Sequence, residues 1–364
     1  MASVYTPETN RSPFLDGRLG DPRLAIGGPL FDALLLWGCP LVCALFVWLW
    51  LGGAAMLPPG LEHAAVASLA AAVAIVTFAH LVAVVPRAYL NPDVFAAHRR
   101  RLTWVPILLV AALLASPALL VCAGVLAIFW DVHHSAMQTF GLARIYDMKA
   151  GNKPLELRQA DLRLNWVLYV GPIAAGASLM DHVGSLRDLG PLGWAAIAGL
   201  PSLAESQAGA IRMAAVAAWI AIGLWAAWDY RSAVARGYRL PVHKAALVGS
   251  TALVSIAAWG LAPPIAAFAI INLFHALQYF ALVWLKEGGR IEAACGRLTG
   301  GLGDRPDRRT RSGALALFLV LCLGFGLAYH GFRDLRWLGG PFIACSLLHF
   351  WYDSFVWSVR KRQV

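Results

Sequence analysis

Residues 130–146 read WDVHHSAMQTFGLARIY, and this stretch decides how the fold is interpreted. It lies in a long apolar run, yet it contains Asp131, His133, His134 and Gln138. Polar and ionisable side chains are costly inside a bilayer, so by default they face the interior of a helical bundle and mark a functional site. We therefore expect other segments of the chain to bring matching polar side chains to this one.

The composition is typical of an integral membrane protein. Hydrophobic residues make up 59% of the 364 residues and charged residues only 14%, a balance that no soluble domain of this length requires. We expect an all-α, polytopic bundle of transmembrane helices that forms one domain over residues 31–360, between a cytoplasmic tail (1–30) and a short final tail (361–364). Residues 1–30 contain no apolar signal-peptide core, so the first spanning helix is expected to initiate insertion.

Apolar runs long enough to cross a bilayer, at about 20 residues per span, predict ten helices. Two tight reversals fall at Ser116-Pro117 and Pro263-Pro264, because proline ends one helix and suits the first turn of the next. The third run is short and is either a span or a re-entrant segment. The predicted helices cover residues 32–52, 64–86, 102–115, 118–146, 163–181, 209–229, 244–261, 264–286, 312–330 and 338–359.

Positive charge orients this ten-helix arrangement, because Lys and Arg concentrate in cytoplasmic loops of membrane proteins. A ten-helix order puts nearly all of the 30 Lys and Arg residues on one side. Both termini are therefore expected in the cytoplasm, with residues 287–311 as a basic cytoplasmic loop. The net charge of +10 then follows from topology, and we expect the lipid bilayer rather than nucleic acid as a partner. The exceptions are Arg187, Arg212, Arg333 and Arg336.

Four histidines on four predicted helices fall at a common depth. The helical distances from each histidine to the basic residue at the cytoplasmic end differ by only about 6 Å, at 1.5 Å per residue. We expect one layer of imidazoles in the cytoplasmic half of the bilayer. The four histidines are His80, His134, His275 and His349.

Polar residues at helical spacing accompany these histidines, because side chains three or four positions apart share a helix face. The neighbours are Asp131 and Gln138 beside His134, Asn272, Gln278 and Tyr279 beside His275, Ser346 and Asp353 beside His349, and Thr77 beside His80.

Imidazole and carboxylate together form the ligand set of a transition metal such as iron, copper, zinc or manganese. We predict His134, His275 and His349 as metal ligands, with Asp131 and Asp353 supplying carboxylates. Metal coordination would also stabilise these groups in a medium of low dielectric constant.

The remaining polar groups have narrower predicted roles. His80 and His133 either complete a second metal site or are hydrogen-bonded packing residues, since His133 points about 100° away from His134. Gln138, Gln278 and Tyr279 are the catalytic candidates: the amides would fix imidazole tautomers, and Tyr279 would donate a proton or an electron. For Asp353 the alternative is an ion pair at the membrane interface.

Several enzyme classes lack their motifs in this chain. There is no HExxH for a zinc protease, no GxSxG for a serine hydrolase and no CxxC among the six cysteines. No helix carries the paired histidines that two stacked haems need, although a single haem held by two histidines stays open.

Two short elements resemble known iron enzymes. The pair His133-His134 resembles part of the HxxHH element of integral-membrane non-haem iron oxygenases, the fatty-acid desaturase and alkane hydroxylase group, although the HxxxH box and the second HxxHH are absent. The stretch HFWYD, residues 349–353, resembles the HxxxD element of the Brp/Blh carotene-cleaving oxygenases. Both resemblances imply iron that activates dioxygen near a lipophilic substrate arriving through the bilayer.

We therefore expect a multi-pass membrane metalloenzyme, located in a bacterial inner membrane, that is an iron-dependent oxygenase, desaturase or hydroxylase. Its site would hold one or two iron ions, act on an apolar small molecule and receive electrons from a soluble donor. Copper, zinc and haem stay open as cofactors. Two other classes also stay open: a transporter with a midplane site for a metal ion or proton-coupled solute, and a haem-binding electron-transfer protein.

Overall fold

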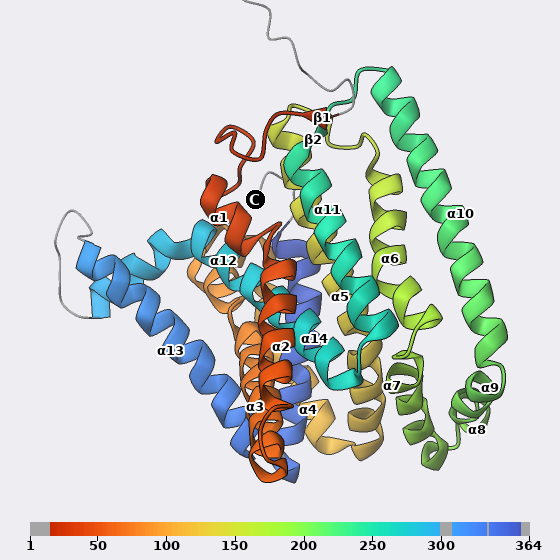
Figure 1. Cartoon of the computed structure of the whole chain (residues 1–364). Helices are drawn as coiled ribbons and strands as arrows, with labels where there is room; N and C mark the ends of the chain where they lie inside the picture. Colours follow the sequence, from red (N-terminus) through yellow and green to blue (C-terminus); the bar gives the residue numbers. More distant parts are fainter. Residues whose placement is uncertain (1–14, 299–307, 333–334, 358–364) are drawn as a thin grey trace, which may run out of the picture.

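The structure is a computed structural model that describes residues 15–298, 308–332 and 335–357. These residues form a bundle of α-helices with one parallel pair of two-residue strands (Figure 1). The strands are β1 (Leu15–Asp16) and β2 (Leu240–Pro241), with Leu15 opposite Leu240. The predicted all-α class is confirmed, and the strand pair is a small addition that the sequence did not predict. The final predicted tail, 361–364, lies outside the described residues.

The described helices include long membrane-type helices and short connecting ones. The α-helices are α1 (Pro29–Leu35), α2 (Cys39–Ala54), α3 (Pro59–Val82), α4 (Pro92–Ala115), α5 (Pro117–Lys149), α6 (Arg158–Ala175), α7 (Leu179–Val183), α8 (Ala195–Ala198), α9 (Leu200–Ser206), α10 (Ala208–Ala235), α11 (Val242–Ser255), α12 (Pro264–Leu298), α13 (Arg308–Phe332) and α14 (Arg336–Val356). The π-helical segments are η1 (Pro86–Leu90) and η3 (Ile256–Leu261), and the 3₁₀ segment is η2 (Gly184–Leu192).

Every predicted span contains a helix, but not every one of these helices is long and apolar enough to cross a membrane. Within the described residues six helices are long and apolar enough to cross a membrane, or seven if α1 and α2, bent by 45°, form one span. The chain is thus a multi-pass membrane protein by the length and composition of its helices, whereas ten spans and cytoplasmic termini stay predictions. The six are Pro59–Leu90, Pro117–Lys149, Ala208–Ala235, Val242–Leu261, Pro264–Arg297 and Thr310–Phe332.

Three predicted spans fall short for identifiable reasons. Helix α4 contains the run 99–101, three consecutive arginines, and α6 begins with Arg158 and also contains Asp161 and Arg163. Helix α14 is apolar in its first half but carries a histidine and an aspartate in its second half. Charged groups make it less favourable for a helix to lie in hydrocarbon. By composition, these three helices are therefore not complete spans.

Helix α12 is the centre of the bundle. Of the residues in its apolar window 72% are buried, against 6% in α10, which packs on α6 at the periphery (Figure 1). Helix α12 packs against α2, α3 and α13. It also continues well past residue 286, its predicted end, because Glu287 is buried and ion-paired with Arg87 at 2.5 Å. The predicted loop 287–311 is therefore helical at its start.

A close backbone contact holds α3 against α13. A Cβ atom placed on Gly326 would lie 2.1 Å from the carbonyl oxygen of Ile75, so only glycine permits this approach. Ile75 precedes Thr77 by two residues on α3, about half a turn, and the contact fixes the position of the helix that also carries His80.

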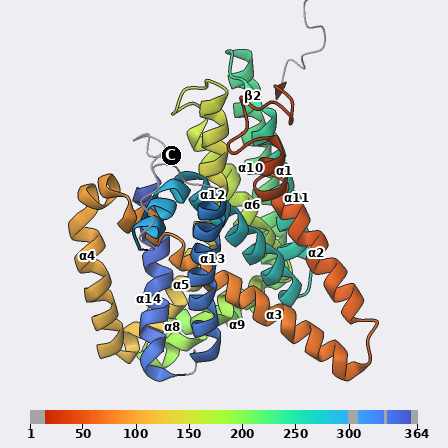
Figure 2. The same ribbon diagram turned by 90° about the vertical axis from the view of Figure 1, so that its left-hand side faces the viewer.

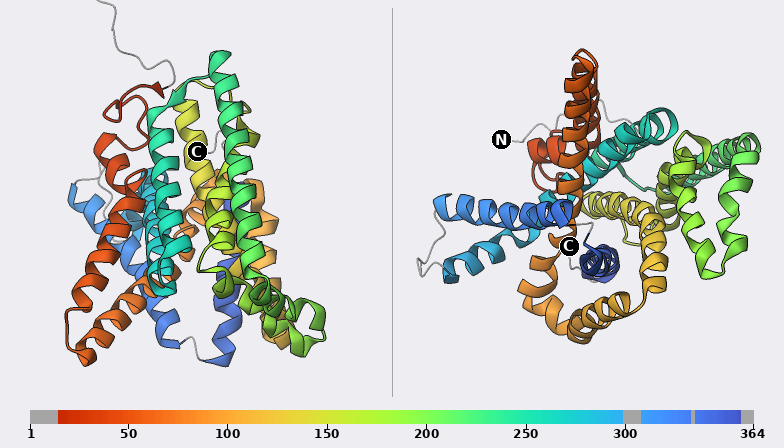
Figure 3. Two further views of the ribbon diagram at one scale, coloured as in Figure 1. Left: turned by 45° about the vertical axis from the view of Figure 1, so that its right-hand side comes forward. Right: turned by 90° about the horizontal axis from the view of Figure 1, so that it is seen from below.

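The connections of the bundle gather at two ends (Figure 2). The turns between α2 and α3 and between α4 and α5 lie at one end, whereas β1, β2 and the turn between α5 and α6 lie at the other. The basic segments 144–163 and 231–244 thus share an end, as the charge distribution predicts. Seen from below, α14 lies inside the curve made by α4 and α5 (Figure 3), and it packs against both.

Candidate metal centre

Four histidines from four helices meet in the interior of the bundle. His80 lies on α3, His134 on α5, His275 on α12 and His349 on α14. One ring nitrogen of each lies within 4.8 Å of one ring nitrogen of every other, and all four residues are buried. The predicted histidine cluster is therefore present, and it includes His80, for which the sequence left a packing role open.

The four rings form a closed circle. Ring centroids of neighbours lie 5.0 Å apart for His80 and His275, 4.9 Å for His275 and His134, 4.8 Å for His134 and His349, and 4.8 Å for His349 and His80. Each ring stands at 72–90° to its neighbours. One nitrogen of each ring lies within 4.8 Å of one nitrogen of every other ring, so the nitrogens converge on a common centre, as they must to share one ion.

Two backbone carbonyls determine which nitrogen of a ring carries the proton. The Nδ1 atom of His349 lies 3.0 Å from the carbonyl oxygen of Leu81, and that of His80 contacts the carbonyl oxygen of Thr77. A carbonyl only accepts hydrogen bonds, so each Nδ1 carries the hydrogen and donates it. The Nε2 atom of each neutral ring then presents a lone pair, which is the form that binds a metal.

The Nε2 atoms of His134 and His349 face each other at 3.1 Å, but other ring nitrogens of the cluster have no hydrogen-bond partner in the described part of the chain. Within the described residues, Nε2 of His80 and both ring nitrogens of His275 are buried without a partner. Leaving a buried polar group unpaired costs about 1–3 kcal/mol. A cation at the centre would satisfy these lone pairs together, so the residues fit a metal ion by the chemistry of their donor atoms.

Asp353 lies at the edge of the circle. Its Oδ2 atom is 3.8 Å from Nε2 of His349 and 3.9 Å from Nε2 of His134. Its Oδ1 atom accepts hydrogen bonds from the hydroxyl of Tyr279 at 2.7 Å and from Nε1 of Trp357 at 3.1 Å. These two donors hold the carboxylate with its second oxygen toward the imidazoles. Sequence reasoning named Tyr279 but missed Trp357, which follows Asp353 by one helical turn.

The glutamines have different partners from those predicted. Nε2 of Gln138 donates to the carbonyl oxygen of His275 and to Oε1 of Gln278, both at 3.0 Å, and Nε2 of Gln278 donates to the carbonyl oxygen of Leu36 at 2.8 Å. Through these bonds the two glutamine side chains connect α5, α12 and the end of α1. The imidazoles of His80 and His349 are oriented by main-chain carbonyls instead. Asn272 bonds within its own helix, to the carbonyl oxygen of Phe268.

Two predicted ligands lie away from the cluster. Asp131 precedes His134 by about 4.5 Å along α5 and by about 60° around it, and its carboxylate is not among the converging ligand atoms. The ring of His133 lies 5.1 Å from that of Trp166 on α6. The described parts of the chain contain no other group of three or more ligand residues, so a second metal site around His133 has no partners there.

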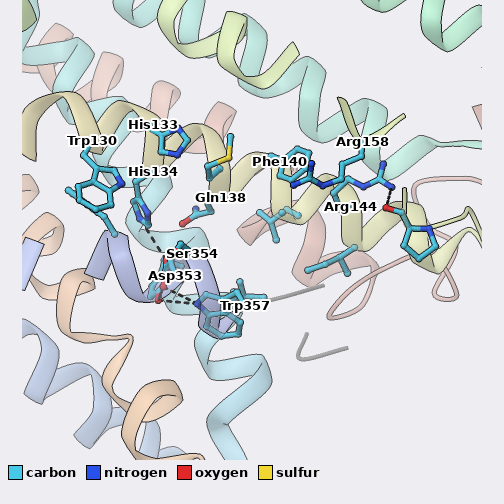
Figure 4. Close-up of a pocket in the computed structure, with 18 of the residues that line it drawn as sticks. Trp130, His133, His134, Gln138, Phe140, Arg144, Arg158, Asp353, Ser354 and Trp357 are labelled. Carbon is cyan, nitrogen blue, oxygen red and sulfur yellow. Dashed lines mark hydrogen bonds and ion pairs between the residues drawn. The ribbon is translucent and has the colours of Figure 1, made fainter. Parts of the chain in front are cut away.

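A cavity of about 860 Å³ extends from the cluster toward the end of the bundle that carries the turn between α5 and α6. His134, Gln138 and Asp353 form part of its wall near the cluster, and Arg144 and Arg158 form part of its wall at the far end (Figure 4). Apolar and aromatic side chains line much of the rest of the cavity, including Trp130, Met137, Phe140, Leu282, Phe350 and Trp357.

A buried ion cluster lies beside the far end of this cavity. Nη1 of Arg144 lies 2.5 Å from Asp147 and 2.6 Å from Asp161, and Nζ of Lys244 lies 2.7 and 2.9 Å from the same carboxylates. Tyr238 donates to Asp147 at 2.5 Å. Burial and the neighbouring Asp147 carboxylate raise the pKa of Tyr238, so its hydroxyl stays protonated. Two cations and two anions thus balance while joining α5, α6 and α11.

No protein-family model, curated protein or solved structure matches this chain, so its function has to be inferred from the site itself.

Proposed function

We propose that this chain is an integral-membrane metalloenzyme in which His80, His134, His275 and His349 hold one iron ion and which oxidises a lipophilic substrate. The observation that carries the proposal is the convergence of four buried imidazole nitrogens within 4.8 Å. The site would be mononuclear, because His133 and Asp131 lie outside the converging group.

The spacing of the nitrogens supports a single ion. A metal–imidazole bond of about 2.0–2.1 Å places the nitrogens of one ion about 3 to 4 Å apart. The pair His134 and His349 already has this spacing, with Nε2 atoms 3.1 Å apart. The rest of the circle needs to contract by well under an ångström at each ring.

Charge also supports a metal ion at this position. Four neutral imidazoles bring no charge of their own, whereas Asp353 places a carboxylate oxygen beside two of them. A divalent cation buried in a bilayer requires anionic compensation. The Asp353 carboxylate supplies part of it, and its hydrogen bonds from Tyr279 and Trp357 keep it in place.

The packing of the rings favours a bare ion over haem. A porphyrin needs a flat slot between its two axial ligands, but neighbouring rings here have centroids only 4.8–5.0 Å apart and form a closed circle. Neighbouring rings are thus too close to hold a porphyrin between them, and a plane drawn between two opposite rings meets the other two.

Iron held by imidazoles supplies one-electron redox chemistry and the activation of dioxygen. The chain itself supplies the surroundings for that chemistry. Trp130 and Phe350 form an apolar wall beside His134, with the Phe350 ring centroid 4.7 Å from that of His134. They exclude water from this part of the cavity, and Asp353 is placed to hold or release a proton at Oδ2. Reducing electrons would come from a soluble donor that binds the basic end of the bundle.

Elemental analysis of the purified full-length protein tests the metal. We expect stoichiometric iron in the wild type and its loss in His275→Ala, because His275 has no other hydrogen-bonding role among the described residues. His133→Ala is the matched control for metal content, since it removes an imidazole next to His134 from the same helix without removing a converging nitrogen. Iron lost equally from both variants, or a wild type without any transition metal, would contradict the proposal. Ion-dependent flux into liposomes would indicate a transporter instead.

A further inference from the structure

The cavity beside the metal centre has two chemically different ends. The inner end carries His134 and Asp353, and the outer end carries Arg144 and Arg158. Along α5 the wall between them follows one helix face, at positions 134, 137, 138, 141 and 145. Beyond His134 and Gln138 this face has no polar side chain, and Phe140, Leu142 and Leu282 add further apolar lining. A molecule that fills the space therefore meets hydrocarbon-like walls for most of its length and a polar group only at each end.

The two arginines at the outer end differ in whether neighbouring carboxylates neutralise their charge. Arg144 is buried, its guanidinium is neutralised by Asp147 and Asp161, and its Nη2 atom donates to the carbonyl oxygens of Lys153 and Pro154. Together with Lys244 these groups have no net charge. The cluster therefore has no unbalanced positive charge for an anionic ligand, and it serves as a rigid wall of the cavity.

Arg158 has a free guanidinium in the described structure. It is solvent-exposed, it has no carboxylate partner among the described residues, and its Cζ atom lies 5.6 Å from the ring centre of Phe140. Phe140 also lines the cavity. Stacking on this ring holds the charge over the mouth while leaving its N–H groups available, as arginine does where it binds anions. The N-terminus of α6, where Leu157 offers no side-chain cap, adds partial positive charge.

From this arrangement we infer that the substrate is a single-chain amphiphile with an anionic head, a carboxylate or a phosphate, that binds Arg158 while its hydrocarbon chain lies along α5 toward His134 and Asp353. The inference rests on the proposed function, because it names the substrate class of that site. Phe140 follows His134 by six residues, about 9 Å along the helix. A head group bound at Arg158 would thus lie at a fixed distance from His134, and the carbon that reacts would be the one at that distance along the chain.

Binding assays on the full chain in detergent test this inference without requiring turnover. The probes are radiolabelled palmitate and 1-hexadecanol, which share a chain and differ in head charge. We expect Arg158→Gln to weaken saturable palmitate binding by about tenfold, the value of a charge-assisted hydrogen bond at an exposed site, and to leave hexadecanol binding unchanged. Arg158→Lys should restore most of the palmitate affinity. Arg231→Gln removes one exposed charge from the same end of the bundle, outside the cavity, and should have no effect.

Competition experiments test which anionic molecules share the site, and a variant without the metal ligand distinguishes failure of this inference from failure of the proposed function. Hexadecyl phosphate should compete with palmitate, whereas acetate and inorganic phosphate at millimolar concentration should not, because they lack the chain. Equal losses of palmitate and hexadecanol binding in Arg158→Gln, or competition by acetate, would overturn the inference. Palmitate binding should persist in His275→Ala. Arg158-dependent binding to a protein that never contains iron would uphold the ligand class while rejecting the metalloenzyme.

Discussion

The Nε2 atoms of His134 and His349 lie 3.1 Å apart in the buried centre of the bundle. His349 uses its Nδ1 hydrogen on the carbonyl of Leu81, so its Nε2 atom presents a lone pair. His134 can donate a hydrogen bond to this lone pair if it carries its hydrogen on Nε2; with the hydrogen on Nδ1, two lone pairs face each other and need a cation between them. A metal ion bound here would meet both nitrogens at the spacing that imidazole ligands of one ion have.

Metal removal should lower the thermal stability of the wild type. Binding to the native state stabilises it by an amount that rises with ligand concentration relative to the dissociation constant, and here the ion would join α3, α5, α12 and α14. We expect dialysis against a strong chelator to reduce Tm in detergent, and iron to restore it. His275→Ala should already have the lower Tm and show no response to the chelator. A chelator effect of equal size in both proteins would mean that the metal is bound elsewhere.

Tyr279→Phe should separate metal binding from turnover. The variant keeps the aromatic ring but removes the 2.7 Å hydrogen bond to Asp353. A hydrogen bond to a charged group contributes about 1.5–3 kcal/mol, so product formation should fall by at least about tenfold while iron content stays near that of the wild type. Iron analysis and product quantification on the same preparation measure the two quantities. Unchanged turnover would show that the orientation of Asp353 does not matter for the reaction.

Gly326→Ala should destabilise the helix pair that positions His80. The new Cβ would meet the carbonyl oxygen of Ile75 at 2.1 Å, and relieving such an overlap costs about 1–3 kcal/mol. Gly324→Ala is the control on the same helix, because its Cβ would meet no atom within 4 Å. Thermal unfolding of both variants, with iron content measured alongside, tests this. Equal Tm values for the two would show that α13 moves away from α3 without cost.

Lys244→Met should be strongly destabilising. It leaves Asp147 and Asp161 with Arg144 alone in a buried cluster, and breaking a buried ion pair costs about 3–5 kcal/mol because an uncompensated charge remains. The double variant Lys244→Met/Asp147→Asn restores charge balance and should recover much of the loss in Tm. Additive effects of the two single substitutions would argue that these groups are not coupled.

Features that depend on a single helix, such as the depth of a residue along it, could be predicted from the sequence. Counting residues from the predicted cytoplasmic ends placed His134, His275 and His349 at a common level, since the rise of a helix is constant. Span number was harder to predict, because α6 and α14 are apolar on average but contain charged residues: Asp161 belongs to the buried ion cluster, Asp353 lies beside the histidines, and Arg158 is exposed at the start of α6.

Contacts between helices could not be predicted in this way. The carbonyl that faces His349 depends on how α3 is rotated about its own axis. Helical spacing in the sequence does not show that Leu81 is the partner. The same applies to Gln138, which has the spacing of an imidazole partner but bonds to main chain. Spacing did contain a usable signal for Trp130 and Trp357, each four residues from a predicted ligand on the same helix face.

The four histidines of the cluster are widely separated in the sequence: His80 lies on the third α-helix and His349 on the last one described. A nascent chain that has inserted α3, α5 and α12 would already expose three imidazoles but would lack both the fourth and the Asp353 carboxylate. Loading of the ion would therefore follow synthesis and insertion of α14, and a ribosome-bound intermediate arrested before that helix should acquire little iron. The order of biogenesis, and not only the final packing, would protect the centre from premature or incorrect metallation.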